Sequence, residues 1–328
     1  MLNWRQNATL SAFFIICFGV IFFSATLNMD DDRFSNNMDD SADSLASESY
    51  FKRADYYLVG KDKSNFHLFS DELIHNQSLR QLILTGPNGV VFSRTGEPIY
   101  YSSESGFYDV ARKFLHLNRS VVVRSRTATI HSDSLKYDDE NKLVSAKGDV
   151  FSKTQNYDQF YEVRINSDEL DYFPERELMN YRGSVDGKIE RKRLYEAPVF
   201  LKADKMTFKM IEKMATLDGN VSIKKQGVTA LSRSGEIFLE NYNKKLKYFA
   251  LYDDVIVKEL VKPPGKKSFE RKSYSEKLEG HNSEGKIVLL GYPKVYQHSD
   301  VLKGNIIILR ENSETIEVDD ANTNFKLR

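Results

Sequence analysis

The stretch LKADKMTFKMIEKMATLDGNVSI, residues 201–223, decides which fold this chain can adopt. Taken alone it resembles a helix, because Met210, Met214 and Leu217 recur at the spacing of an amphipathic helix. Ala, Lys, Glu and Met are also good helix formers. The alternative is a pair of strands joined by a turn at KMIEK. The chain holds further copies of the same pattern, and these copies distinguish the two structures.

The pattern repeats with a constant internal spacing. An acidic residue at position zero is followed by an aromatic residue at +4, an apolar residue at +10, glycine at +15 and valine at +17. Clear copies begin at Asp133, Asp168 and Asp204, which lie 35 and 36 residues apart. Such a period is typical of repeat architectures. Weaker copies begin at Asp71, Glu104 and Glu276, and residues 248–257 match residues 214–223 with Asp253 in the glycine position.

The midpoints of the copies exclude a helix. One midpoint reads FPERE, and its Pro174 would remove a helical hydrogen bond and clash with the preceding turn. Another reads DDENK, a composition typical of turns. Apolar residues two apart place each pair on one face of a strand; the pairs are Leu135 with Tyr137, Leu170 with Tyr172, and Met206 with Phe208. We expect the glycine at +15 to form a turn or bulge that opens the next strand. The sequence therefore predicts an all-β fold of stacked antiparallel hairpins, an elongated β-jellyroll or solenoid.

The N-terminus carries a separate signal. Residues 10–27 form an uncharged apolar run, long enough as a helix to cross a bilayer core. Arg5 precedes the run and acidic residues follow it, which predicts a cytoplasmic N-terminus at residues 1–9 and an exported remainder. A cleaved signal peptide is the alternative. Residues 28–49 are rich in Ser, Asp and Asn, which is typical of a disordered linker. We expect residues 50–328 to form the folded, exported β domain.

The composition points away from several function classes. Lys plus Arg and Asp plus Glu both number 47, so no net charge favours nucleic acid as a partner. The single cysteine, Cys17, lies within the apolar run and leaves the folded part without a thiol. No nucleotide, hydrolase or metal-binding motif is present, so we expect no enzymatic activity, cofactor or metal. Two basic clusters, residues 187–196 and 262–272, are interpreted as solvated loops or as sites for phosphate or acidic partners.

The C-terminal part resembles the closing part of OstA-like domains from the lipopolysaccharide-transport LptC/LptA family. The matching residues are Gly291, Pro293, Val295 and Gln297, then Gly304, Ile306 and Ile308, then the IEV triplet at Ile316–Val318. The anchor is similar to that of LptC, whereas the long folded part suggests an extended LptC that covers part of LptA's bridge. The resemblance implies a single-pass inner-membrane protein that accepts lipopolysaccharide from an inner-membrane ABC transporter. It also implies an LptA-like bridge protein as the next partner, paired through terminal strand edges.

The resemblance implies an apolar groove for acyl chains, and the repeat frame and the closing motif supply the residues expected to line it. These candidates are Leu135, Tyr137, Leu143, Val150, Leu170, Tyr172, Leu178, Val185, Met206, Phe208, Met214, Val221, Ile306 and Ile308. Candidates for headgroup or partner contact are Lys188, Arg191, Lys192, Arg193, Lys266 and Lys267. Two alternatives remain: a structural or adhesive envelope protein with a filled β core, and a periplasmic enzyme with a polysaccharide site. A filled interior would favour the first alternative, and carboxylates clustered in a cleft would favour the second.

Overall fold

The structure is a computed structural model that describes residues 48–59, 64–93, 96–155, 161–191, 197–238, 249–265, 267–281, 284–310 and 312–319. These residues belong to one compact unit, Ser47–Arg328. The expected anchor at residues 10–27 and almost all of the expected linker lie outside the described residues. Across the described ranges, no helix is long and apolar enough to span a membrane.

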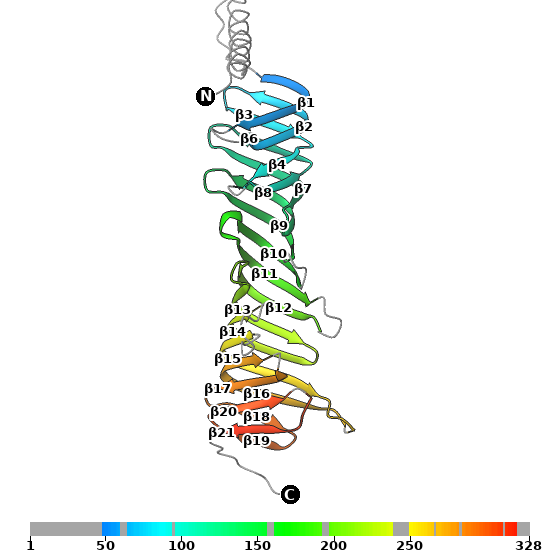
Figure 1. Ribbon diagram of the computed structural model, residues 1–328, viewed down its shortest axis with the longest axis vertical. Coiled ribbons are helices and arrows are strands. Elements are labelled where there is room, and N and C mark those ends of the chain that lie inside the picture. The colour runs from blue at the N-terminus through cyan, green and yellow to red at the C-terminus, as the bar shows by residue number, and fades with distance from the viewer. Residues whose placement is uncertain are drawn as a thin grey trace, which may run out of the picture. The chain divides into compact units, whose positions relative to one another are not determined.

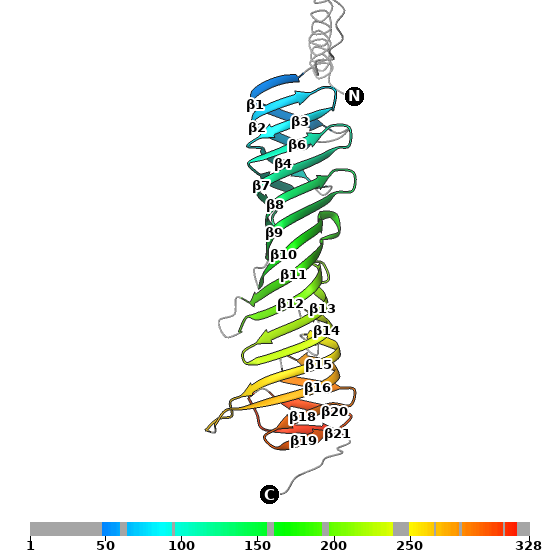
Figure 2. The ribbon, with the colours of Figure 1, turned by 180° about the vertical axis from the view of Figure 1, so that it is seen from behind.

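The unit is built from antiparallel strands that follow one another in chain order through its middle part (Figures 1 and 2). The 21 strands of the described residues join one hydrogen-bonded network. Their bounds are β1 (Glu48–Val59), β2 (Ser64–Asn76), β3 (Gln81–Thr85), β4 (Asn88–Phe92), β5 (Pro98–Ser102), β6 (Ser105–Asp109), β7 (Phe114–Arg124), β8 (Ala128–Asp138), β9 (Leu143–Gln155), β10 (Tyr161–Phe173), β11 (Leu178–Arg191), β12 (Val199–Lys209), β13 (Met214–Lys225), β14 (Val228–Phe238), β15 (Phe249–Val261), β16 (Phe269–His281), β17 (Lys286–Leu290), β18 (Lys294–Gln297), β19 (Asp300–Lys303), β20 (Ile306–Arg310) and β21 (Ile316–Asp319). The predicted all-β jellyroll is confirmed.

The segment 201–223 forms the predicted hairpin. β12 and β13 pair with each other, and residues 210–213 of the KMIEK segment form the turn between them. Pro174 begins a single 3-10 turn, Pro174–Arg176, at the equivalent place between β10 and β11. The helical spacing of the methionines is thus a property of one copy of the repeat, whereas the turn is shared by the copies.

The glycine of the repeat lies inside a strand and does not open one. In β11, Gly183 and Ser184 both have positive φ, 73° and 45°, and form a bulge beside Asp168 of β10. A Cβ atom on Gly183 would lie 2.2 Å from Asp168 Oδ2, so only glycine fits there. Position zero and position +15 of the repeat are therefore contact partners. The same paired positive φ occurs at Gly148–Asp149, Gly219–Asn220, Arg119–Ser120 and Asp253–Asp254.

The bulges divide the long strands into two arms, and the arms build two facing layers. In β2, residues 72–76 pair with β3, whereas residues 66–69 pair with β4. β16 divides in the same way between β17 and β18. We call the layer that contains β3, β6, β17, β20 and β21 the first layer, and the layer that contains β4, β5, β18 and β19 the second layer. Apolar side chains from both layers form one continuous core between them.

Candidate functional site

The interior between the layers holds most of the residues predicted to line a groove. Each of them is buried and belongs to the common core. They are Leu135, Tyr137, Val150, Leu170, Tyr172, Val185, Met206, Phe208 and Val221. The frame positions +4 and +17 therefore point inward, and the interior is lined by apolar and aromatic side chains. Whether any of them contacts a lipid stays a prediction.

The frame position +10 points outward, which corrects the remaining candidates. Leu143 is half-buried, whereas its neighbours Val144 and Ala146 are in the core. The inward residues are thus one position later than expected, because the turn before the strand uses one residue fewer than assumed and a shift by one residue reverses the face. The same correction applies to Leu178 and Met214, where Met179 and Ala215 are buried instead. Ile306 and Ile308 lie outside the frame and also point outward, and Ile307 and Leu309 are buried in their place.

Polar contacts between β9 and β11 cross the apolar interior. The Tyr181 hydroxyl, from the first-layer arm of β11, lies 2.8 Å from Ser152 Oγ, from the second-layer arm of β9. It also lies 3.0 Å from Met179 Sδ, and Thr154 Oγ1 lies 3.9 Å from the same sulfur. Burial raises the pKa of the Tyr181 phenol, with the Ser152 hydroxyl acting in the opposite direction. The phenol therefore stays neutral and joins the two layers.

The two layers end at two rows of turns that face each other, and the space between these rows is the mouth of the interior. A hollow in the mouth is lined by residues far apart in the sequence. Ser125, Arg126 and Thr127 come from the second-layer row, and Pro174, Glu177 and Ile211 come from the first-layer row. Ile211 is exposed there although it is apolar. The core residues Ile99 and Tyr172 also line this hollow, so the apolar core reaches the mouth there.

A buried ion pair closes the C-terminal end of the mouth. Arg271, in the second-layer arm of β16, donates from Nε and Nη2 to Glu259 Oε2 at 3.0 and 2.7 Å. Its Nη1 donates to the carbonyl oxygen of Ser313, which follows first-layer strand β20, at 3.0 Å. Gln297 Nε2 donates to the Glu314 carbonyl oxygen at 3.2 Å. These contacts, the C-terminal clamp, hold the segment after β20 against the second layer.

An apolar cavity lies next to the C-terminal clamp, between the layers. Its apolar walls come from both layers, with Ile223, Val228 and Ala230 on one side and Phe249, Ile287 and Leu309 on the other. Lys225, Lys286 and Arg310 lie at its edge. The core is thus not uniformly filled, although the two layers pack directly against each other along most of the unit.

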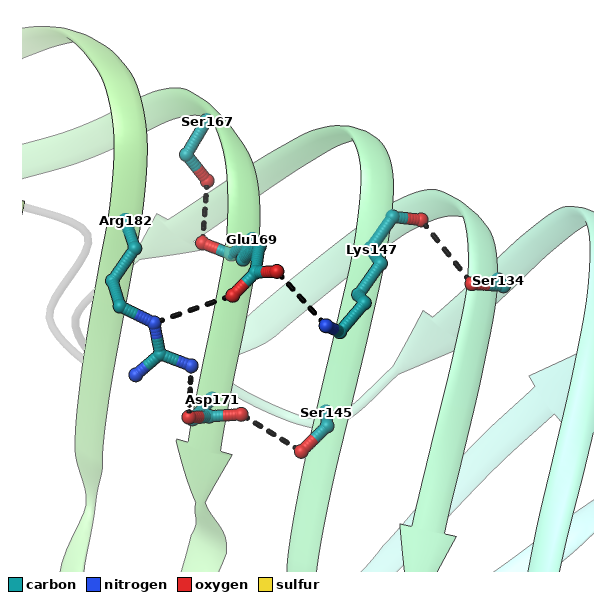
Figure 3. Close-up of polar contacts among 7 residues, drawn as sticks. All are labelled: Ser134, Ser145, Lys147, Ser167, Glu169, Asp171 and Arg182. Carbon is teal, nitrogen blue, oxygen red and sulfur yellow. Dashed lines mark hydrogen bonds and ion pairs between the residues drawn. The ribbon is translucent and has the colours of Figure 1, made fainter.

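On the outer face of the first layer, oppositely charged side chains of neighbouring strands form ion pairs with one another (Figure 3). Lys147 Nζ lies 2.9 Å from Glu169 Oε1, and Arg182 Nε lies 3.3 Å from Glu169 Oε2. Arg182 Nη2 lies 2.6 Å from Asp171 Oδ2, and Ser145 Oγ donates to Asp171 Oδ1. Hydrogen bonds from Lys147 and Arg182 lower the pKa of the Glu169 carboxyl. Opposite charges on neighbouring strands stabilise a sheet modestly, so this network is structural.

Two of the predicted headgroup side chains, Lys188 and Lys267, lie within the described residues. Lys188 lies in β11 and pairs with Glu190. Lys267 lies exposed between β15 and β16. Nothing is described for Lys192, Arg193 or Lys266, nor for the side chain of Arg191. The prediction of a loop over residues 262–272 is wrong at its end, because Arg271 and Lys272 belong to β16 and the Arg271 side chain is buried.

Sequence reasoning missed the residues that tie the layers together. Tyr181 and Ser152 lie outside the repeat frame, and the distance of 29 residues between them gives no local signal. In β15 the inward residues Val255 and Val257 alternate with outward ones, and this alternation places Glu259 inside. Arg271 lies between Glu270 and Lys272 and has no apolar alternation beside it. The inward placement of Glu259 was the signal available for the C-terminal clamp.

The fold and the interior define a class of protein: an elongated β-jellyroll whose two layers enclose a continuous apolar core with a lateral mouth. A family model described as "Lipopolysaccharide-assembly, LptC-related" matches residues 13–159. A second, described as "LptA/(LptD N-terminal domain) LPS transport protein", matches residues 201–315. The chain is an LptC/LptA-like protein, and these families imply a role in lipopolysaccharide transport.

A solved structure is also similar to part of the chain. It is the crystal structure of LptH, the LptA-homologous periplasmic component of the lipopolysaccharide transport device from Pseudomonas aeruginosa. The identity is 15%, the match covers 38% of this chain and 84% of that chain, and the TM-score is 0.34. No curated protein sequence matches the chain.

Proposed function

We propose that this protein is a membrane-anchored, periplasmic component of lipopolysaccharide export. Residues 10–27 anchor it in the inner membrane, and the β unit accepts lipopolysaccharide from an ABC transporter there. The acyl chains then move along the interior between the layers toward an LptA-like bridge protein, which pairs with a terminal strand edge. The observation that carries the proposal is the continuous apolar core between two layers that have a lateral mouth.

The physical requirement of lipid transport explains such an interior. Exposing an acyl chain to water costs about 0.8 kcal/mol per CH₂ group. A chain that crosses an aqueous space therefore needs apolar contacts at every step, and each hairpin of the repeat adds inward residues such as Leu170, Tyr172 and Phe208. Because the layers pack against each other, acyl chains enter only when the layers separate at the mouth.

The strands between the two matched segments support the idea that this one chain combines an LptC-like part with an LptA-like part. The LptC-related match ends at residue 159 and the LptA-like match begins at residue 201. Across this interval β9 pairs with β10, β10 with β11 and β11 with β12, each in antiparallel register. The core runs through this interval without a break. We infer that cargo passes from the LptC-like part to the LptA-like part inside a single sheet, without a change of protein.

Photocrosslinking in living cells tests the proposal. A photoreactive amino acid at Tyr172 or Phe208, both buried between the layers, is expected to capture lipopolysaccharide. The matched control is Tyr252, whose hydroxyl bonds Glu236 on the outer face. Depletion of the protein is expected to leave lipopolysaccharide at the inner membrane. Capture at Tyr252 but not at the interior positions would refute the proposal.

The second candidate is a structural envelope protein with a filled core, which the close packing of the two layers favours. This alternative predicts no capture at any interior position and normal lipopolysaccharide export after depletion. The two readouts together separate it from the transport function.

A further inference from the structure

A single row of basic and aromatic side chains with two threonines runs across the outer face of the second layer. Each member lies directly opposite the next on a neighbouring strand. In order the row is Tyr100, Arg124, Thr129, Lys153, Arg164, Lys188, Phe200, Lys224, Thr229, Lys258, Lys272 and Tyr296. We call it the cation row. It contains no acidic residue, although the whole chain has equal numbers of acidic and basic residues.

The cation row is unfavourable for the sheet itself. Arg164 is opposite both Lys153 and Lys188, and Lys258 is opposite Lys272. Like charges directly opposite each other destabilise a sheet. On the first layer, by contrast, Glu169 lies between Lys147 and Arg182 and forms the ion pairs of Figure 3 with both. The second layer therefore carries a charge pattern that folding does not favour, and an anionic partner would compensate it.

The two halves of the cation row differ in their counter-charges. Glu162 and Glu190 flank the N-terminal half, where Lys153, Arg164 and Lys188 form ion pairs with them. In the C-terminal half, no ion pair to a carboxylate is formed by Lys224, Lys258 or Lys272 within the described ranges, and the Lys272 ammonium lies over the Tyr274 ring. These three cations are available to an external anion.

Aromatic rings frame the available cations. Phe200 precedes Lys224 in the row and is 44% exposed, and Tyr296 follows Lys272 and is 42% exposed. Neighbouring strands lie roughly 4.8 Å apart, so the stretch from Phe200 to Tyr296 spans roughly 24 Å. Thr229, Lys258 and Lys272 also line one hollow of the surface. Exposed rings and ammonium groups in single file suit a narrow, extended ligand with apolar faces and anionic groups.

The position of the row relates it to the interior. β13 ends one residue after Lys224, at the turn of residues 226–227. Thr229 lies two residues after Gly227 of that turn. Leu260, which lies two residues beyond Lys258, donates its backbone N–H to the carbonyl oxygen of Gly227. The row therefore runs along the outer rim of the second layer, next to the turns that form one side of the mouth. A polar group attached to an acyl chain in the interior would emerge at this rim.

We propose that the C-terminal half of the cation row binds the anionic saccharide part of the transported lipid through its phosphate or carboxylate groups. This inference rests on the proposed function for the source of the saccharide. The saccharide leaves the mouth, folds over the rim and places its anionic groups on Lys224, Lys258 and Lys272 while Phe200 and Tyr296 contact sugar faces. A membrane surface is a poorer partner, because the row is one residue wide and Glu162, Glu190 and Glu270 lie beside it on the same face.

The test uses the full chain in nanodiscs of zwitterionic lipid. The probe is the phosphorylated oligosaccharide released from lipopolysaccharide by mild acid, and its binding is measured by calorimetry or fluorescence. The triple variant Lys224→Gln, Lys258→Gln, Lys272→Gln removes the three available cations. The matched control variant carries Lys52→Gln, Lys136→Gln and Lys205→Gln on the first layer. We expect binding on the order of tenfold weaker or more in the row variant, unchanged in the control, and weaker for both at high salt.

Other probes and a second readout separate the outcomes. Enzymatic or chemical removal of the phosphates from the oligosaccharide is expected to abolish the difference between the variants. If the row variant binds the oligosaccharide as well as the unchanged protein, the inference is overturned. If it loses binding to anionic phospholipid vesicles or to peptidoglycan fragments but not to the oligosaccharide, the row serves that ligand and the inference is equally overturned. Capture of lipopolysaccharide at Phe208 in the row variant shows that the proposed function holds in either case.

Discussion

Replacing Arg271 by alanine tests the C-terminal clamp most directly. The Arg271 side chain is 0% exposed and the Glu259 side chain 4%, so the variant leaves a carboxylate in the core without its guanidinium. Breaking a buried pair from one side costs about 3–5 kcal/mol, because the remaining charge stays desolvated. The carbonyl oxygens of Ser313 and Arg310 also lose their donors. We expect unfolding at a melting temperature lower by roughly 6–15 °C.

The assay is thermal and denaturant unfolding of the full chain, followed by circular dichroism. Hydrogen exchange of β20 and β21 adds a local readout, because the clamp holds the segment between them. The matched control is the double variant Arg271→Met, Glu259→Leu, which removes both charges and keeps apolar volume. Such replacements are often neutral or stabilising, so we expect it within about 1 kcal/mol of the unchanged protein. A single variant as stable as the unchanged protein, or a double variant as unstable as the single one, would refute the reasoning.

Three further outcomes follow from other contacts. Tyr181→Phe leaves Ser152 Oγ buried without its partner and should lower the free energy of unfolding by about 1–3 kcal/mol in denaturant unfolding. Adding Ser152→Ala should recover part of that loss. Equal costs for the single and the double variant would count against the cross-layer bond. Gly183→Ala should cost about 1–3 kcal/mol, since its φ is 73° and its Cβ would meet Asp168, and an unchanged denaturation midpoint would contradict this. Burial raises the pKa of the Tyr137 phenol. The stability that the buried neutral phenol contributes is therefore complete below the unfolded-state pKa of about 10 and is lost as the pH rises above it. The free energy of unfolding should fall when the pH is raised from 9 to about 11, and it should fall less in the variant Tyr137→Phe.

The repeat frame predicted the strands because its signals are local. Pro174 cannot lie inside a helix, and residues such as Leu170 and Tyr172 alternate over a short span, so one copy informs the others. The frame could not fix the residue that begins the second strand, because the number of residues in a turn depends on backbone conformation. That uncertainty of one residue was enough to reverse the orientation of Leu178.

The candidate site was predictable only in its apolar part. Inward residues follow the period of the strand, whereas Tyr181 and Arg271 matter through partners that lie far along the chain or on the opposite layer. The cation row has the same character. Lys224, Lys258 and Lys272 are unevenly spaced in sequence, and only the register of the sheet brings them into one line.

The order of the strands has a consequence for how the chain acquires its structure. From β7 to β16 every strand pairs with the strands just before and after it in sequence. Each new strand finds its template already formed at the growing edge, and closing one more short loop costs little entropy. A chain that emerges N-terminus first can therefore fold one hairpin at a time, long before β21 has been delivered. The unit needs no distant part of the sequence to begin folding, and at each stage it exposes a strand edge on which the next strand can pair.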